Sequence, residues 1–367
     1  MRRVGLAASV FGMAIMLFAG TVCASSGTQS APERVEIEYA REFAPERVEI
    51  EYAHEFALEA GEDGSFDVTI GEEHYHVDRP YSRIYLAASS AMDLFLKGGG
   101  IEAVASTGTK EADWGIEEIR ELIGSGEIQY AGKYSAPDYE YLTASGCDLA
   151  IESTMIYHTP EVKEKLEALG IPVLVERSSY ETDPLGRMEW IKLYGALTGH
   201  YAEAAAFFDS RMQELKALEG FENTGKKVAF FYINSSGQPV VRKPGDYVSR
   251  MIAMAGGAYF LETADGEDNM LSTMNMEMEA FVEAAGDADI LIYNSSISGE
   301  LYRMDELTGM NGIFGRFKAV RNGDVWCTGK NMFQESSAVA DMILEMHEII
   351  CGSAGDGSGL GYFHRLT

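Results

Sequence analysis

The strongest constraint on the fold is a helical stretch in the middle of the chain, "DPLGRMEWIKLYGALTGHYAEAAAFFDSRMQELKALEG", which runs from Asp183 to Gly220. Pro184 suits the first turn of a helix, and Gly199 interrupts the helical pattern. One helix is therefore predicted over residues 184–197 and a second over residues 201–218, the second roughly 27 Å long at 1.5 Å per residue. Apolar residues at helical spacing predict the buried stripe of the second helix: Tyr201, Ala205, Phe208, Met212 and Leu215.

Short apolar runs alternate with helices on both sides of this stretch, which predicts parallel sheets covered by helices on both faces. Before it, a hairpin is predicted from "FDVTI" and "YHV", and strands from "SRIYLAA", "EAVAS", "IQYAG", "CDLAIES" and "IPVLVE". After it, "KKVAFFYIN", "ADILIYNSS" and "GDVWCTG" are predicted strands, and "DYVSRMIAMAGG" and "ESSAVADMILEMHEII" are predicted helices. The predicted fold class is α/β, with two Rossmann-like lobes joined by one long backbone helix and a ligand cleft between the lobes.

The chain is predicted to divide at the composition changes along it. The predicted parts are a signal peptide (1–24), a tether (25–65), an N-terminal α/β lobe (66–183), connecting helices (184–219), a C-terminal α/β lobe (220–351) and a glycine-rich, disordered tail (352–367).

The first residues carry the pattern of an export signal. Arg2 and Arg3 precede an apolar run over residues 4–19, which is short for a membrane span, and small residues follow it. The protein is therefore predicted to be exported, to the periplasm or the outer face of the cell membrane. Cys23 also suggests lipidation, but Val22 stands where a lipobox has a small residue, so a lipid anchor stays open.

A tandem duplication follows the signal. "APERVEIEYAREF" at Ala31–Phe43 recurs as "APERVEIEYAHEF" at Ala44–Phe56, with Arg41 replaced by His54. Two copies are too few for a solenoid, which needs several units to bury a core. One copy is predicted to join the first strand, and the other to be loose or to form an extra edge strand.

The net charge excludes some classes of partner, and the cysteine spacing excludes some disulfide and metal sites. The formal net charge of −29 argues against nucleic acid and anionic lipid, because both are bound by basic patches. Cys147, Cys327 and Cys351 are spaced too widely for a disulfide framework or a zinc site. Buried free thiols are predicted, with a Cys327–Cys351 pair as the alternative, and the chain is predicted to be a monomer.

No catalytic motif stands out in the sequence. G-x-S-x-G, H-E-x-x-H, a Walker loop and a G-x-G-x-x-G following a strand are absent, so the protein is predicted not to be an enzyme and to need no cofactor. His74 and His76 lie on one face of a predicted strand, but a third ligand at a telling distance is missing, and no metal site is predicted.

Three stretches resemble a known family. "SRIYLAASSAMDLF" looks like an opening strand that runs into a helix at the cleft, and "APDYEYLTASGCDLAI" like a segment in which a glutamate starts a helix before a strand marked by Asp. "FKAVRNGDVWCTGKN" resembles a late turn that precedes a strand. Over residues 82–350 the chain is similar to the helical-backbone substrate-binding proteins of ABC importers, which serve iron-siderophores, haem and cobalamin.

The resemblance implies two docking glutamates, one per lobe, that bind arginines of a membrane permease. By motif these are Glu140 and Glu279, while Glu277 and Glu283 stay open because the C-terminal spacing is two residues longer. Each glutamate can equally be an ordinary helix-start residue that favours the helix dipole.

Ligand contacts are expected from loops at the carboxyl ends of the strands. The candidates are Ser89, Ser90, Trp114, Tyr134, Met155, Tyr157, His158, Tyr180, Arg187, Asn234, Arg242, Tyr247, Asn294, Lys330 and Asn331. Aromatic rings with a few cations and hydroxyls suit a bulky, partly anionic ligand.

Several candidates also have a structural alternative. Ser89 and Ser90 can cap a helix, Arg187 can pair with Glu181 or Asp183, and Tyr247 can belong to the core. Met155, Tyr157 and His158 can ligate haem iron.

The predicted function is delivery of an iron-siderophore-type chelate to an ABC importer. A haem or corrinoid cargo is the alternative, as is a surface-retained receptor without transport. The expected partners are the permease and a small-molecule metal chelate.

Overall fold

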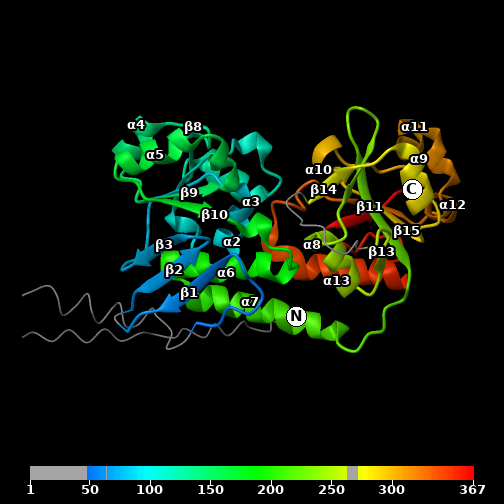
Figure 1. The fold of residues 1–367 in the computed structure, drawn as a ribbon, viewed down its shortest axis with the longest axis horizontal. Coiled ribbons are helices and arrows are strands. Elements are labelled where there is room, and N and C mark those ends of the chain that lie inside the picture. The colour runs from blue at the N-terminus through cyan, green and yellow to red at the C-terminus, as the bar shows by residue number, and fades with distance from the viewer. Residues whose placement is uncertain (1–47, 63, 263–271) are drawn as a thin grey trace, which may run out of the picture.

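A computed structural model of the chain describes residues 48–62, 64–262 and 272–367. The predicted signal peptide, Cys23 and the first copy of the duplication lie outside these residues. Figure 1 shows two α/β lobes side by side, with helices running beneath them. In the described part of the chain, no helix is long and apolar enough to cross a membrane.

The N-terminal lobe is built on a five-stranded sheet in which every neighbouring pair is parallel. Asp148 accepts hydrogen bonds from the backbone N–H groups of Ser82 and Arg83 and so fixes the start of the central strand. The strand order is β10 (Val173–Glu176), β9 (Leu149–Ser153), β4 (Ile84–Leu86), β5 (Val104–Thr107) and β6 (Gln129–Tyr130). Helices α2 (Met92–Lys97), α3 (Glu117–Ser125), α4 (Tyr139–Ala144) and α5 (Pro160–Ala168) and the short hairpin β7 (Gly132–Lys133) and β8 (Ala136–Pro137) complete the lobe.

The C-terminal lobe has a mixed sheet, parallel at its centre and antiparallel at both edges. Its strand order is β14 (Thr273–Asn275), β12 (Pro239–Arg242), β11 (Lys227–Ile233), β15 (Ile290–Tyr293), β16 (Val325–Thr328) and β17 (Phe363–Arg365), with β13 (Ala258–Tyr259) pairing β11. β11, β15 and β16 are parallel, whereas β12, β14 and β17 are antiparallel to their neighbours. The helices are α8 (Tyr247–Met254), α9 (Met278–Ala285), α10 (Ser295–Ser298), α11 (Met304–Met310), α12 (Lys318–Asn322) and α13 (Val339–Cys351).

The helical stretch that joins the lobes is a pair of packed helices, α6 (Pro184–Thr198) and α7 (Tyr201–Leu215). Asp183 caps α6 through the N–H of Leu185, and Gly199 ends it in the left-handed conformation. The Ala204 side chain is fully buried and Ala205 only partly, which corrects the predicted stripe. The reason is a close approach: a Cβ on Gly195 would lie 2.6 Å from the Ala204 Cβ.

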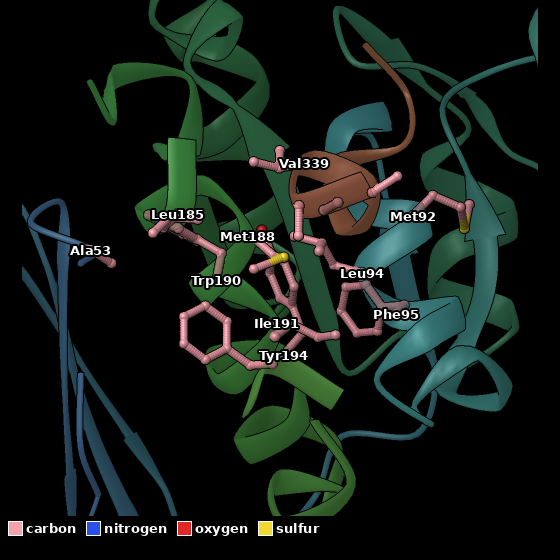
Figure 2. Close-up of a cluster of buried hydrophobic side chains, with 14 of the residues drawn as sticks. Ala53, Met92, Leu94, Phe95, Leu185, Met188, Trp190, Ile191, Tyr194 and Val339 are labelled. Atoms are coloured by element: carbon pink, nitrogen blue, oxygen red, sulfur yellow. The ribbon is translucent and has the colours of Figure 1, made fainter. Parts of the chain in front are cut away.

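Helix α6 lies in the core between α2 and the N-terminal strands. Figure 2 shows Leu94 and Phe95 of α2 facing Ile191 and Tyr194 of α6, and the rings of Phe95 and Tyr194 stack with centroids 4.7 Å apart. Almost every α6 side chain is buried, so packing rather than an amphipathic pattern holds this helix.

A three-stranded antiparallel sheet covers the other side of α6. It consists of β1 (Phe56–Ala60), β2 (Phe66–Ile70) and β3 (Glu73–Val77), and the last two form the predicted hairpin. Phe56 packs edge-on against Trp190 with centroids 4.9 Å apart. Phe56 is the last residue of the second copy of the duplication, which therefore joins the first strand as predicted.

The C-terminal tail is ordered, contrary to the prediction. After Gly352 the chain turns back and forms β17 against β16, and Phe363 and Leu366 are buried. A three-residue strand that follows a glycine-rich stretch is too short to show a periodic pattern, so the sequence marks it only by its apolar residues. The three cysteines of the described residues are free, but only Cys327 is buried, while Cys351 is exposed, so the prediction of buried thiols is wrong for Cys351.

Candidate functional site

Two adjoining hollows form a cleft between the lobes, of about 230 Å³ and 390 Å³. They share Ser179, Arg187, Tyr247 and Ser272, so they are two parts of one site. Residues of the N-terminal lobe, of α6 and of the C-terminal lobe all contribute to the walls. A site at such a junction is where open α/β sheets place ligands.

Arg187 enters the cleft from the first turn of α6. Its Nε donates to the carbonyl oxygen of Glu181 at 3.0 Å, and its Nη2 donates to that of Ser179 at 2.7 Å. The guanidinium lies over the ring of Tyr247, 3.7 Å from the centroid. Arg187 therefore bonds to the Glu181 backbone rather than to the carboxylate suggested by the sequence.

Arg242 enters from the end of β12 in the C-terminal lobe. Its Nη1 lies 3.2 Å from Ser272 Oγ and 3.5 Å from the carboxylate of Asp246, and its guanidinium lies 4.8 Å from the Phe333 ring. Burial raises the pKa of Asp246, although Arg242 opposes the shift. Because Asp246 also caps α8 through the N–H of Val248, it fixes Arg242 and Tyr247 relative to each other.

Tyr247 lies between these cations and is almost fully buried. Burial raises the pKa of its hydroxyl, so Tyr247 is neutral at physiological pH. Around it, Ser90, Ser179, Ser272 and Ser336 add hydroxyl groups. Two guanidinium groups beside an aromatic ring and several hydroxyls can hold a partly apolar anion by charge-assisted hydrogen bonds and stacking.

Three acids line the cleft: Glu181 and Asp246 in the larger hollow and Glu335 in the smaller one. Burial raises the pKa of Glu335 to about 6. Its Oε1 accepts a hydrogen bond from Asn331, and Glu335 also lines a third hollow of about 350 Å³ together with Asp93 and Asn331. The charge of this cleft wall therefore changes within the pH range of ordinary experiments.

The segment around Glu335 crosses from the C-terminal lobe to the N-terminal lobe. Gln334 accepts from the N–H of Gly115 at 2.7 Å and donates to the carbonyl of Asp113 at 2.9 Å. The N–H of Ser337 donates to Asp93 at 2.9 Å. These bonds tie the lobes together beside the cleft, in addition to α6 and α7.

Six of the fifteen sequence-predicted contacts meet in this cleft. Three come from short 3₁₀ turns, one from the end of strand β12, and two from helices α6 and α8: Ser90, Met155, Tyr180, Arg242, Arg187 and Tyr247.

The other nine lie elsewhere. Trp114 is buried, Asn294 is buried and caps α10, and Asn234 accepts hydrogen bonds from Ser236 and Gln238 in the β11–β12 turn. Ser89 and Tyr134 are partly buried, Tyr157, His158 and Lys330 are exposed outside the two cleft hollows, and Asn331 lines the third hollow.

Sequence reasoning missed Ser178, Ser179, Ser272, Phe333, Glu335 and Ser336. Ser178 and Ser179 stand directly before the predicted Tyr180, so they could have been found as neighbours. Phe333, Glu335 and Ser336 lie in the loop that crosses between the lobes, and the sequence does not mark this crossing.

The two predicted docking glutamates occupy matching places. Glu140 lies in the first turn of α4 and Glu279 in the first turn of α9, and both side chains are exposed. Both helices lie on the upper side of the molecule in Figure 1, opposite α7. Of the alternatives, Glu277 accepts a hydrogen bond from Gln238, and Glu283 is exposed.

The described residues contain no cluster of three or more His, Cys, Asp or Glu side chains arranged to hold a metal ion. His74 hydrogen-bonds Thr69, and His76 contacts Asp67.

Sequence comparison finds distant relatives. No family model matches the chain. It is 24% identical over 318 residues to an uncharacterized lipoprotein of Methanocaldococcus jannaschii, which covers 81% of this chain and 72% of the relative. A second uncharacterized lipoprotein of that organism is 29% identical over 261 residues, covering 68% of this chain and 64% of the relative.

Solved structures with the same fold are periplasmic binding proteins. One from Veillonella parvula superposes with a TM-score of 0.62 at 15% identity, over 81% of this chain and 98% of the other. An Fe³⁺-hydroxamate transport protein of Saccharomonospora viridis gives 0.56 at 19% identity, over 76% and 96%. A periplasmic haem-binding protein of Vibrio cholerae gives 0.56 at 18% identity, over 71% and 98%. The chain therefore has the two-lobed periplasmic-binding-protein fold that its sequence predicts.

Proposed function

We propose that the protein is an extracytoplasmic solute-binding protein that delivers an iron-siderophore-type complex to an ABC importer. The observation that carries the proposal is the pair Arg187 and Arg242, held beside Tyr247 at the junction of the two lobes. Fixed cations in a partly buried cleft suit the negative charge of a carboxylate or catecholate chelate. The proposed role is binding and not catalysis.

The cleft favours a chelate that brings all of its own metal ligands. Of the three residues for which haem ligation is the alternative, only Met155 lines the cleft, while Tyr157 and His158 lie outside it. The Met155–Tyr157–His158 segment therefore offers a haem at most one iron ligand in the cleft. A haem or corrinoid cargo is the second candidate, since neighbours of the same fold are described as binding haem and vitamin B12.

Export, and anchoring through Cys23, are part of the proposal. The predicted signal supports export, and two distant relatives are described as lipoproteins. Glu140 and Glu279 are proposed to bind the permease, which their exposure on one side of the molecule supports. The alternative of a surface-retained receptor predicts that neither glutamate matters.

The test is a titration of the chain from Ser25 onward with a ferric tris-catecholate, a ferric hydroxamate, haemin and cyanocobalamin. Quenching of tryptophan fluorescence is a suitable signal, because Trp190 lies on the same helix as Arg187. Saturable binding of one probe at micromolar affinity or tighter, lost in the Arg187→Gln/Arg242→Gln variant, is expected. Lys330→Gln serves as a matched control, because Lys330 is an exposed cation outside both cleft hollows. Binding that survives loss of both arginines would contradict the proposed site.

A further inference from the structure

Five consecutive backbone N–H groups of the second copy of the duplication end on two buried carboxylates. Those of Glu51, Tyr52 and Ala53 donate to Glu189 at 2.7–3.1 Å. Those of the next two residues, His54 and Glu55, donate to Glu181 at 2.9–3.0 Å. Residues 51–55 are referred to below as the docked segment.

Both carboxylates are built into the core of the molecule. Glu189 is 0% exposed and also accepts from Lys192 Nζ at 2.8 Å, and Glu181 is 2% exposed and also accepts from the indole N–H of Trp190 at 3.1 Å. Hydrogen bonds to an ionised acceptor are the strong ones, and a buried carboxylate that loses its donors is costly. The position of Glu181 therefore depends on the docked segment.

Glu181 connects the docked segment to the cleft. Its side chain accepts hydrogen bonds from the N–H groups of His54 and Glu55. Its backbone carbonyl oxygen accepts a hydrogen bond from Arg187 Nε at 3.0 Å. Glu181 also lines the larger hollow of the cleft. One residue thus joins the N-terminal segment on one side to the cleft arginine on the other.

A second route starts from the Glu55 side chain. Its carboxylate binds Arg177 Nε at 2.7 Å, and the Arg177 guanidinium lies over the ring of Tyr180, 4.7 Å from the centroid. Tyr180 lines the same hollow. Both routes end on side chains that line the cleft, Arg187 in the first turn of α6 and Tyr180 in the segment between β10 and α6.

We propose that the docked segment is a positioning element of the ligand cleft, which holds Arg187 through Glu181 and Tyr180 through Arg177. Glu181 and Arg177 are positioning residues. The inference rests on the proposed function of the cleft as a ligand site.

The two copies of the duplication have almost the same sequence, so both contain the residues whose N–H groups and carboxylate make the contacts described above. The copies differ only at Arg41 and His54, and the His54 side chain is exposed, so docking at that position uses the N–H alone. The test therefore changes the matching position in both copies.

The test is the Arg41→Pro/His54→Pro variant, in which proline removes the N–H that donates to Glu181. Arg41→Ala/His54→Ala is the matched control, because it removes the same side chains and keeps the N–H. Two quantities are measured: amide hydrogen exchange of residues 178–190 without ligand, and the Kd for whichever probe of the panel binds the wild type.

In the proline variant we expect exchange in residues 178–190 to rise and the Kd to weaken about tenfold or more, as for loss of a hydrogen bond to a charged group. The alanine control should match the wild type in both. Unchanged exchange overturns the proposal, and so does raised exchange with an unchanged Kd, since the segment then supports only the fold. If no probe binds the wild type, the proposed function fails, while the exchange data still test the coupling.

A second variant covers the case in which the proline variant does not fold. Glu42→Gln/Glu55→Gln removes the carboxylate that binds Arg177 and keeps every backbone donor. We expect the Kd to weaken about threefold, with Glu38→Gln/Glu51→Gln as the control, because the Glu51 side chain is exposed. An unchanged Kd in Glu42→Gln/Glu55→Gln removes the second route.

Discussion

The two lobes anchor a central strand of the sheet in the same way, but the edges of their sheets differ. In each lobe an aspartate at the start of a strand fixes the neighbouring central strand: Asp148 binds the N–H of Ser82, and Asp289 binds that of Lys227. The N-terminal sheet is parallel throughout, whereas antiparallel strands close both edges of the C-terminal sheet. The two lobes therefore share the way in which a central strand is anchored and differ in the edges of their sheets.

The two lobes also contribute different side chains to the ligand cleft. The antiparallel strand β12 carries Arg242 into the cleft, and the loop after β16 carries Phe333 and Glu335. The N-terminal lobe contributes hydroxyls, Met155 and Tyr180. The C-terminal lobe thus supplies the cation Arg242 and the acids Asp246 and Glu335, and the N-terminal lobe adds the acid Glu181.

The largest expected effect concerns what the lobes share. Reversing one glutamate in each, Glu140→Arg with Glu279→Arg, should abolish uptake and leave the ligand Kd unchanged, because the side chains are exposed and outside the cleft. Uptake of the radiolabelled ligand by cells that carry the importer measures this. Glu222→Arg, exposed before β11, is the control. If Glu279→Arg has no effect alone, Glu277→Arg and Glu283→Arg identify the alternative, and a lost ligand affinity contradicts docking.

The second-largest expected effect concerns β17, the antiparallel strand at one edge of the C-terminal sheet. Phe363→Ala should lower the free energy of unfolding by about 3–5 kcal/mol, because it leaves a cavity under β17. Gly359→Ala in the same tail is the control, since a Cβ there meets nothing within 4 Å. Urea denaturation measures both variants. A Phe363→Ala variant as stable as the wild type would show that the tail does not close the sheet.

The matching aspartates should be equally replaceable. Asp148→Asn and Asp289→Asn should each cost about 1 kcal/mol, because both oxygens of each carboxylate accept hydrogen bonds and an amide keeps only one accepting oxygen. Partial burial raises the pKa of Asp289, but Lys318 and the N–H of Lys227 lower it more, so the net shift is below the usual 3.8. A lowered pKa stabilises the fold above pH 3.8, and this contribution is lost as the pH falls through the folded-state pKa.

The measurement is unfolding at several pH values. The Asp289→Asn variant should lack that part of the acid destabilisation. Identical acid profiles for the variant and the wild type would contradict the assignment.

The smallest expected effect concerns Glu335, an acid of the C-terminal lobe that lines the cleft. Below pH 6 Glu335 is protonated and no longer repels an anionic ligand, so affinity should rise about threefold as the pH falls from 7.5 to 5. Arg242 on the cleft side and Asp93, Lys97, Asp341 and Tyr362 around Glu335 are the other ionisable groups near it. Glu335→Gln should remove this pH dependence in an isothermal titration. A pH dependence that persists in the variant assigns it to another group.

The sequence predicts only some of the residues that line the cleft, and the reason is physical. Arg187, Arg242, Tyr180 and Met155 follow strands or begin a helix, so the rule that ligands meet strand ends identifies them. Asn294 obeys the same rule, yet its side chain turns back to cap α10. Whether a side chain at a strand end faces the ligand or its own backbone depends on local hydrogen bonding that the residue type does not reveal.

The sequence by itself determined the central parallel strands of both sheets, the connecting helices and the two-lobed arrangement, because apolar periodicity and helix-ending glycines are local signals. Tertiary structure alone decided the pairing of β17 with β16, the crossing of Gln334 to the N-terminal lobe and the docking of residues 51–55 on Glu181 and Glu189. Each of these joins residues far apart in the chain, and at least one partner is a backbone group, which every residue type except proline offers alike and which therefore leaves no mark in a sequence.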